Sequence, residues 1–113
     1  MEDRATFRKL ELNDGQEVEM CLTFGRLLKL REKYPEEYKK YNKLAMDGVK
    51  DEVDFPTFLY AGYLCANIDS MESCMSEEEF YEKLPENHAL VIGTVMALRY
   101  GDSKKKPDSE KVS

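Results

Sequence analysis

The chain has 113 residues, which suits one domain with a modest hydrophobic core. Apolar residues make up 42% of it and charged residues 35%, so we expect a packed interior beneath a strongly charged surface. The net charge of −6 argues against a general nucleic-acid binder, because such affinity comes largely from neutralising phosphates. The longest nearly apolar stretch, Phe55 to Ile68, is too short to cross a bilayer, and the N-terminus does not resemble a secretory signal. We therefore expect a cytoplasmic protein with no membrane partner.

Charge is distributed unevenly along the chain. The segment from Thr23 to Lys50 holds eight Lys or Arg residues and four acids, whereas the segment from Asp51 to His88 holds ten acids and one base. Such a chain could fold its basic part onto its acidic part, or pair head-to-tail with copies of itself. Two solvated helix faces without a partner explain the pattern equally well.

The first predicted element is a β-hairpin over residues 6–22. Leu10 and Leu12 alternate with charged residues in its first half, and Val18 and Met20 do so in its second half. The residues between them, Asn13–Gly15, tolerate the positive φ of a tight turn. The hairpin should therefore cover the helices with one apolar face.

Two helices are predicted next. Thr23 is a plausible N-cap for a helix from Phe24 to Tyr34, in which Phe24, Leu27 and Leu28 share one side. Pro35 suits the first position of a second helix, and Gly48 suits its end. One continuous helix with a kink is the alternative.

The third predicted helix runs from Phe55 to Ile68, with Asp54 as its cap. It is apolar or small nearly all the way round, so we expect it to be the buried centre of the fold. Gly62 costs roughly 1 kcal/mol relative to Ala in a helix interior, which is tolerable if another backbone packs closely there.

A loop over 69–75 precedes the last two predicted helices. Ser76 and Glu79 form a capping-box pattern that opens a short helix, and Pro85 should end it and begin the last one, which stops at Gly101. The apolar face of that helix is predicted to contain Leu90, Val91, Thr94, Val95 and Leu98. The sequence thus predicts a mainly α (α+β) domain of about five helices with an N-terminal hairpin over 1–101, and a disordered charged tail over 102–113.

No residue pattern indicates catalysis. The single histidine, His88, has no oriented partner at a recognisable spacing, and we interpret it as a surface or capping residue. Cys21, Cys65 and Cys74 form no C-x-x-C motif; we expect Cys65 in the core and only Cys74 exposed. Two acidic runs fall where helices begin, which explains them without a metal. We expect no enzyme, metal or cofactor.

The tyrosines of the two basic helices are the best candidate binding surface. Tyrosine suits protein interfaces, where the ring is buried and the hydroxyl bonds, but the same residues could simply surround the core. Stacking on nucleic acid fits poorly with the acidic balance. The candidate residues are Tyr34, Tyr38, Tyr41, Lys39, Lys40 and Lys43.

Four stretches together resemble a known family. The runs are Leu22–Arg31, Tyr38–Lys43, Phe58–Asn67 and Glu78–Phe80, and they are similar to tail assembly chaperones of siphophages and prophages of Firmicutes. The order of the predicted elements also matches, over roughly residues 6–103. The motifs are hydrophobic and helical, and no single residue is a signature.

The resemblance implies a chaperone that binds the apolar tape measure protein before the tail tube polymerises around it, and that is absent from the finished virion. It implies self-association as a homo-oligomer. It also implies, in many phages, a frameshifted longer product that recruits tail tube protein. A run of three lysines could be encoded by a slippery sequence, although a solubilising tail explains it equally well: Lys104, Lys105 and Lys106.

One alternative comes from another functional class. A small DNA-binding regulator or anti-repressor of a mobile element would also be short and helical. Its recognition helix would have to lie between Thr23 and Lys43, the basic part of the chain, and the net acidity disfavours it.

Overall fold

Residues 7–101 are described by the computed structural model, and the structural statements below refer to them. The predicted fold class is confirmed: two strands pair as an antiparallel hairpin and five α-helices follow within this range. The elements are β1 (Arg8–Glu11), β2 (Glu17–Met20), α1 (Phe24–Lys33), α2 (Pro35–Asp47), the 3-10 turn η2 (Glu52–Asp54), α3 (Phe55–Ala66), the 3-10 turn η3 (Met71–Ser73), α4 (Glu77–Glu82) and α5 (His88–Tyr100). The predicted tail 102–113 lies outside the described residues.

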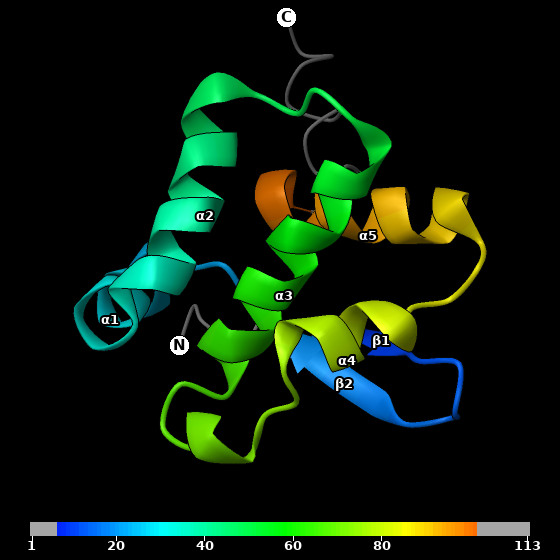
Figure 1. Ribbon diagram of the computed structural model, residues 1–113, viewed down its shortest axis with the longest axis horizontal. Coiled ribbons are helices and arrows are strands. Elements are labelled where there is room, and N and C mark those ends of the chain that lie inside the picture. The colour runs from blue at the N-terminus through cyan, green and yellow to red at the C-terminus, as the bar shows by residue number, and fades with distance from the viewer. Residues whose placement is uncertain (1–6, 102–113) are drawn as a thin grey trace, which may run out of the picture.

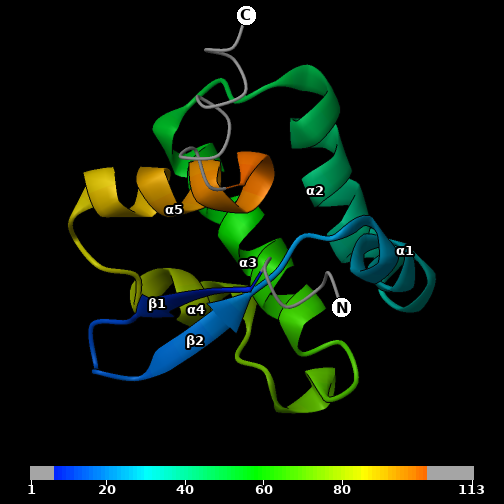
Figure 2. The same ribbon diagram turned by 180° about the vertical axis from the view of Figure 1, so that it is seen from behind.

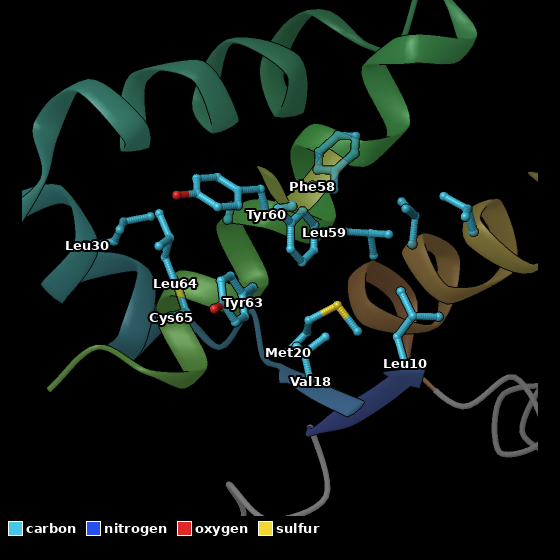
Figure 3. Packing of buried hydrophobic residues seen from close by; sticks show 14 of the residues in the cluster. Leu10, Val18, Met20, Leu30, Phe58, Leu59, Tyr60, Tyr63, Leu64 and Cys65 are labelled. Carbon is cyan, nitrogen blue, oxygen red and sulfur yellow. The ribbon is translucent and has the colours of Figure 1, made fainter. Parts of the chain in front are cut away.

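Helix α3 is the centre of the molecule. Helices α1 and α2 lie on one side of it, and α4, α5 and the hairpin lie on the other, in both views of the fold (Figures 1 and 2). Every residue from Phe58 to Cys65 is buried. Figure 3 shows side chains of α3 packing toward the hairpin and toward α1. The prediction of a helix buried on all sides is therefore confirmed, since an apolar helix without a polar face is stable only when covered.

The hairpin pairs Leu10 with Val18, which places both side chains in the core. Its turn contains Gly15 at a φ of +89°, a conformation that favours glycine. The turn is also held by the segment that follows α4. The Asn13 amide donates a 2.8 Å hydrogen bond to the Lys83 carbonyl, and the Asn13 side chain donates one of 2.8 Å to the Leu84 carbonyl.

Gly62 is where the hairpin meets α3. A Cβ on Gly62 would lie 3.2 Å from the Cβ of Met20 and 3.4 Å from the backbone nitrogen of Cys21. Another backbone thus packs closely at this glycine, which is the condition under which the sequence indicated that Gly62 would be tolerated. The close approach explains why a residue with poor helix propensity stands in the middle of the central helix.

Helices α1 and α2 are separate, so the alternative of one kinked helix is wrong. Tyr34, expected as the last residue of the first helix, is instead its C-cap, with φ −137° and ψ 69°. Pro35 excludes helical geometry at the preceding residue and then begins α2. The other caps follow prediction: the Thr23 hydroxyl accepts from the Arg26 amide, and Gly48 ends α2 at a φ of +92°.

Asp54 stands at the N-cap position of α3, as predicted, but its side chain makes no capping hydrogen bond to that helix. Its carboxylate accepts from the Lys50 and Asp51 amides at 3.1 and 3.2 Å, and so holds the turn η2 in front of the helix. The Asp51 carboxylate accepts in return from the Val53 amide at 3.3 Å. Two carboxylates three residues apart thus make a reciprocal cap, a pattern that competes with capping of the next helix. The helix itself ends at Ala66, two residues before the predicted end.

The last helix begins later than predicted. Pro85 was expected to be its first residue, but Asn87 is the N-cap, its side chain accepting from the Leu90 amide at 3.1 Å, and His88 is the first helical residue. A proline both ends a helix and suits the start of another, whereas the asparagine side chain fixes the actual start. Val91 and Val95 are buried as predicted.

Leu90 was expected on that buried face and is instead among the exposed apolar side chains. The buried stripe of α5 follows Val91 and Val95, four residues apart, and Leu90 lies to one side of it. The Ser76 hydroxyl caps α4 by accepting from the Glu79 amide at 3.2 Å, as predicted.

The loop between α3 and α4 is held by two tyrosines of α3. The Tyr60 hydroxyl donates to the Met75 carbonyl at 2.9 Å, and the Met75 amide donates to the Tyr63 hydroxyl at 3.0 Å. Both backbone polar groups of one residue are thereby satisfied. The same loop contains Cys74, which is half-buried rather than exposed as predicted, because it packs against the core.

Candidate functional site

The three candidate tyrosines do not occupy equivalent places. Tyr38 and Tyr41 are half-buried, and their rings lie 6.0 Å apart. Tyr41 also packs edge-on against Phe58 of α3 at 5.8 Å, and burial raises the pKa of its hydroxyl. Tyr34 lies at the junction of α1 and α2 and is exposed. The tyrosines of α2 therefore connect the core to the surface.

Tyr38 and Tyr41 line a hollow of about 270 Å³ between α1 and α2. We call it the tyrosine groove and define it by Phe24, Leu28, Arg31, Tyr38, Tyr41 and Met46. Phe24 is 90% exposed, Met46 is 74% exposed and Leu28 is 46% exposed. Large apolar side chains in this number around one hollow are typical of a surface that another molecule covers.

Sequence reasoning found the tyrosines of this groove but missed its apolar walls. Phe24, Leu27 and Leu28 were read as one face of a helix, and that spacing is correct. Only Leu27 is buried, because α1 meets the core along Leu27 and Leu30 and turns Phe24 away from it. Met46 was not singled out at all, and no signal in the sequence separates it from a core residue.

The candidate lysines lie outside the groove. Lys39 and Lys43 are exposed, and Lys43 forms an ion pair of 3.7 Å with Asp47 of its own helix. Lys40 lies 2.8 Å from Glu77 of α4, and Glu37 approaches the same ammonium at 3.8 Å. Of the six candidate residues, only Tyr38 and Tyr41 therefore line the same hollow.

The contact between Lys40 and Glu77 joins the basic part of the chain to the acidic part. Partial burial acts to raise the pKa of Glu77, but hydrogen bonds from Lys40 and Tyr81 hold that pKa below its ordinary value. The hydrogen bond to Glu77 raises the pKa of Lys40. Lys33 and Asp69 approach each other at 4.0 Å as a second such contact. The chain thus folds part of its charge onto itself, one of the two outcomes that the charge pattern predicted.

Two further basic side chains are engaged within the fold. Arg26 of α1 donates to the Cys65 carbonyl at 2.9 Å, and its guanidinium lies 5.1 Å from the centre of the Phe7 ring. Arg99 of α5 lies over Phe58 at 4.4 Å, on the ring that Tyr41 also contacts. These contacts stabilise the packing of α1 and α5 on α3.

A larger cleft of about 510 Å³ lies between η2, the start of α3 and α5. We call it the acidic cleft and define it by Glu52, Val53, Phe55, Leu84, Glu86 and Val91. His88 contacts the Glu52 carboxylate through Nδ1 at its edge, so the histidine has a partner that sequence spacing did not reveal. No serine, threonine or cysteine within the described range lines this cleft, and both residues of the contact are exposed at the surface.

Among residues 7–101, no three His, Cys, Asp or Glu side chains gather as a metal would require. Within the same range, none of the helices has the length and hydropathy needed to traverse a bilayer. Comparison with protein-family models, with curated proteins and with solved structures found no match to this chain.

Proposed function

We propose that this protein is a tail assembly chaperone of a phage or prophage, which binds the apolar tape measure protein in the host cytoplasm while the tail is built. The observation that carries the proposal is the tyrosine groove. The side chains of Phe24, Leu28 and Met46 are exposed to solvent around this hollow, which the rings of Tyr38 and Tyr41 also line. The choice of the tape measure protein as the client rests on the resemblance of motifs in α1 to α4 to the chaperone family.

The groove suits a helical client with a leucine-rich face. An amphipathic helix binds by laying apolar side chains into such a hollow, and methionine and tyrosine adapt to clients of varied sequence. Burying a phenylalanine fully is worth about 1.5–3 kcal/mol. Phe24 alone could therefore supply a substantial part of the affinity for one client segment.

Further partners belong to the same proposal. We propose that copies of the chain self-associate, and that tail tube protein binds an extended form of it. Self-association through charge would use charged residues other than Lys40 and Glu77, because these two already neutralise each other within one chain. The lysines 104–106, which suggested a frameshift, lie outside the described residues.

No contact in the described part of the structure favours the alternative of a DNA-binding regulator. Of the basic residues that a recognition helix would offer to phosphates, Arg26 donates to the Cys65 carbonyl and Lys40 pairs with Glu77. Direct phosphate contact would require both to leave these partners.

Co-expression with the tape measure protein encoded nearby in the same genome tests the proposal. We expect the native chain to keep that client soluble and to co-purify with it. The double variant Phe24→Ser, Met46→Ser should lose most of this effect while folding normally, since both side chains are exposed. Tyr100→Ser, which removes an exposed apolar ring that lines neither this groove nor the acidic cleft, is the matched control. A client that stays insoluble with the native chain would overturn the proposal.

A further inference from the structure

The acidic cleft lies across α3 from the tyrosine groove and differs from it in charge. Its interior is apolar, with Phe55, Leu84 and Val91 among the lining side chains. Its volume of about 510 Å³ falls within the range of about 300–1,000 Å³ that is usual for binding pockets. The walls come from separate parts of the chain, η2 with α3 on one side and the segment from α4 to α5 on the other (Figure 1).

One wall presents an apolar side chain outward on a fixed turn. Val53 is 71% exposed, although it belongs to a turn held by the reciprocal Asp51 and Asp54 caps. The contact between Glu52 and His88 ties this turn to α5. A side chain held in place before binding loses little conformational entropy when a partner covers it. Covering Val53 would therefore cost little conformational entropy.

The charge at the cleft identifies the kind of partner. Among residues 7–101, two carboxylates, Glu52 and Glu86, line the cleft together with His88, which contacts Glu52, and no lysine or arginine does. By contrast, in the same part of the chain Arg31 lines the tyrosine groove and no carboxylate does. An apolar hollow edged by carboxylates complements an apolar segment edged by lysine or arginine, and repels one edged by acids.

We infer that the acidic cleft is a docking site for a basic amphipathic helix of a partner protein. The apolar face of that helix lies against Val53, Phe55 and Val91, and its lysine or arginine side chains meet Glu52 and Glu86. The site is independent of the client site proposed above, because different elements form it and the opposite charge selects its ligand.

A pair of synthetic helical peptides tests this inference on the full chain. Both carry the same leucine face; one is edged by lysine and the other by glutamate. Backbone amide shifts in ¹⁵N NMR spectra report where each binds. We expect the lysine-edged peptide to shift the amides of Val53 and Val91 and to bind at least about tenfold more tightly than the glutamate-edged one.

Three variants locate the effect. Glu86→Lys reverses one carboxylate at the cleft without touching the Glu52 contact, and should weaken the lysine-edged peptide several-fold. Val53→Ser should weaken both peptides at this site. Glu72→Lys makes the same charge change on η3, beyond the other end of α3, and should leave binding unchanged.

Several results would overturn the inference. These are equal affinity for the two peptides, shifts that avoid the cleft, or a loss with Glu72→Lys as large as with Glu86→Lys. Cleft amides already broadened in the free protein, and sharpened by dilution, would show that a second copy occupies the cleft instead. The client proposal is judged separately, because its test is the solubility of the tape measure protein with the Phe24→Ser, Met46→Ser double variant.

Discussion

The amide of Cys21 donates a 3.0 Å hydrogen bond to the carbonyl of Gly62, so the end of β2 lies directly on the central helix. The approach leaves no free space for a side chain at Gly62, where a Cβ would also come within 3.4 Å of Leu98. Gly93 of α5 is the opposite case, because a Cβ there would meet no atom of the described residues within 4 Å beyond its chain neighbours and its own helix backbone. The two glycines therefore respond differently to the same substitution.

We expect Gly93→Ala to stabilise the protein by about 0.5–1 kcal/mol, since alanine has the higher helix propensity and the site is open. Gly62→Ala should lose that gain and lower the free energy of unfolding by about 1 kcal/mol, because the new methyl group forces apart a strand and a helix. Urea denaturation of the two variants measures both values. Equal stabilisation by both would show that the hairpin can move away from α3.

The Tyr63 hydroxyl gives a second prediction. Tyr63→Phe leaves the Met75 amide without its acceptor, and an unsatisfied buried donor costs about 1–3 kcal/mol. We expect a stability loss in this range, together with faster proteolysis of the loop that contains η3. Tyr34→Phe, which removes an exposed hydroxyl, serves as the control and should change neither quantity. An unchanged stability would mean that the Met75 amide finds another acceptor.

The fold could be predicted because each helix carries its own signals. Caps at Thr23 and Ser76 and the glycine at Gly48 are local, and the apolar run of α3 indicates a buried helix by itself. The errors occurred where two local signals competed. Asp54 could cap forward or backward, and Pro85 could end one helix or begin the next; only the three-dimensional neighbours decide between such alternatives.

The candidate site was predicted less well for a different reason. Periodicity shows which residues share a face of a helix, but it does not show whether anything covers that face. Phe24 and Leu27 share such a face, yet one is exposed and the other is buried. The contact of Lys40 with Glu77 joins residues far apart in the sequence, and a charge pattern indicates that such contacts exist without indicating which pairs form.

That contact gives a third prediction, about acid. A carboxylate whose pKa is lowered by folding contributes stability that is present above its ordinary pKa and is lost as the pH falls through the lowered value. Glu77 should therefore contribute at pH 7 and cease to contribute as the pH falls below its ordinary value of 4.5. Glu77→Gln should reduce the fall in stability between pH 5 and about pH 3, as measured by urea denaturation.

A double-mutant cycle isolates the pair itself. Lys40→Met, Glu77→Gln and the double variant should give a coupling free energy of about 0.2–1 kcal/mol, because both side chains are partly exposed and water screens their attraction. A coupling near zero would show that the pair with Lys40 does not stabilise the fold and would leave the Tyr81 hydrogen bond as the cause of the lowered Glu77 pKa.

The buried thiol of Cys65 gives a prediction about the stability of the protein at alkaline pH. Burial raises the pKa of this thiol to about 12 from an ordinary value of 9.0. A group whose pKa is raised by folding contributes stability that is present below the ordinary pKa and is lost as the pH rises toward the folded value. The temperature of thermal unfolding should therefore fall progressively above pH 9, and burial of the Tyr60 and Tyr81 hydroxyls acts in the same direction.

Thiol alkylation checks the same burial directly. In the native protein at pH 8, iodoacetamide should modify Cys74 first and leave Cys65 unmodified until urea unfolds the chain. Peptide mass spectrometry measures the order. Equal rates for the two thiols under native conditions would mean that α3 opens far more often than its packing implies.

The hydrogen bonds from Asn13 have a consequence for the protein during its synthesis. The partner of the Asn13 side chain, Leu84, is 71 residues further along the chain, and at about 5–20 residues per second the ribosome needs roughly 4–14 s to add it. In that interval the hairpin turn lacks its acceptors, and α3 lacks the cover of α5. A nascent chain stalled before Leu84 therefore exposes its most apolar helix, and would itself be a substrate for the cell's folding machinery.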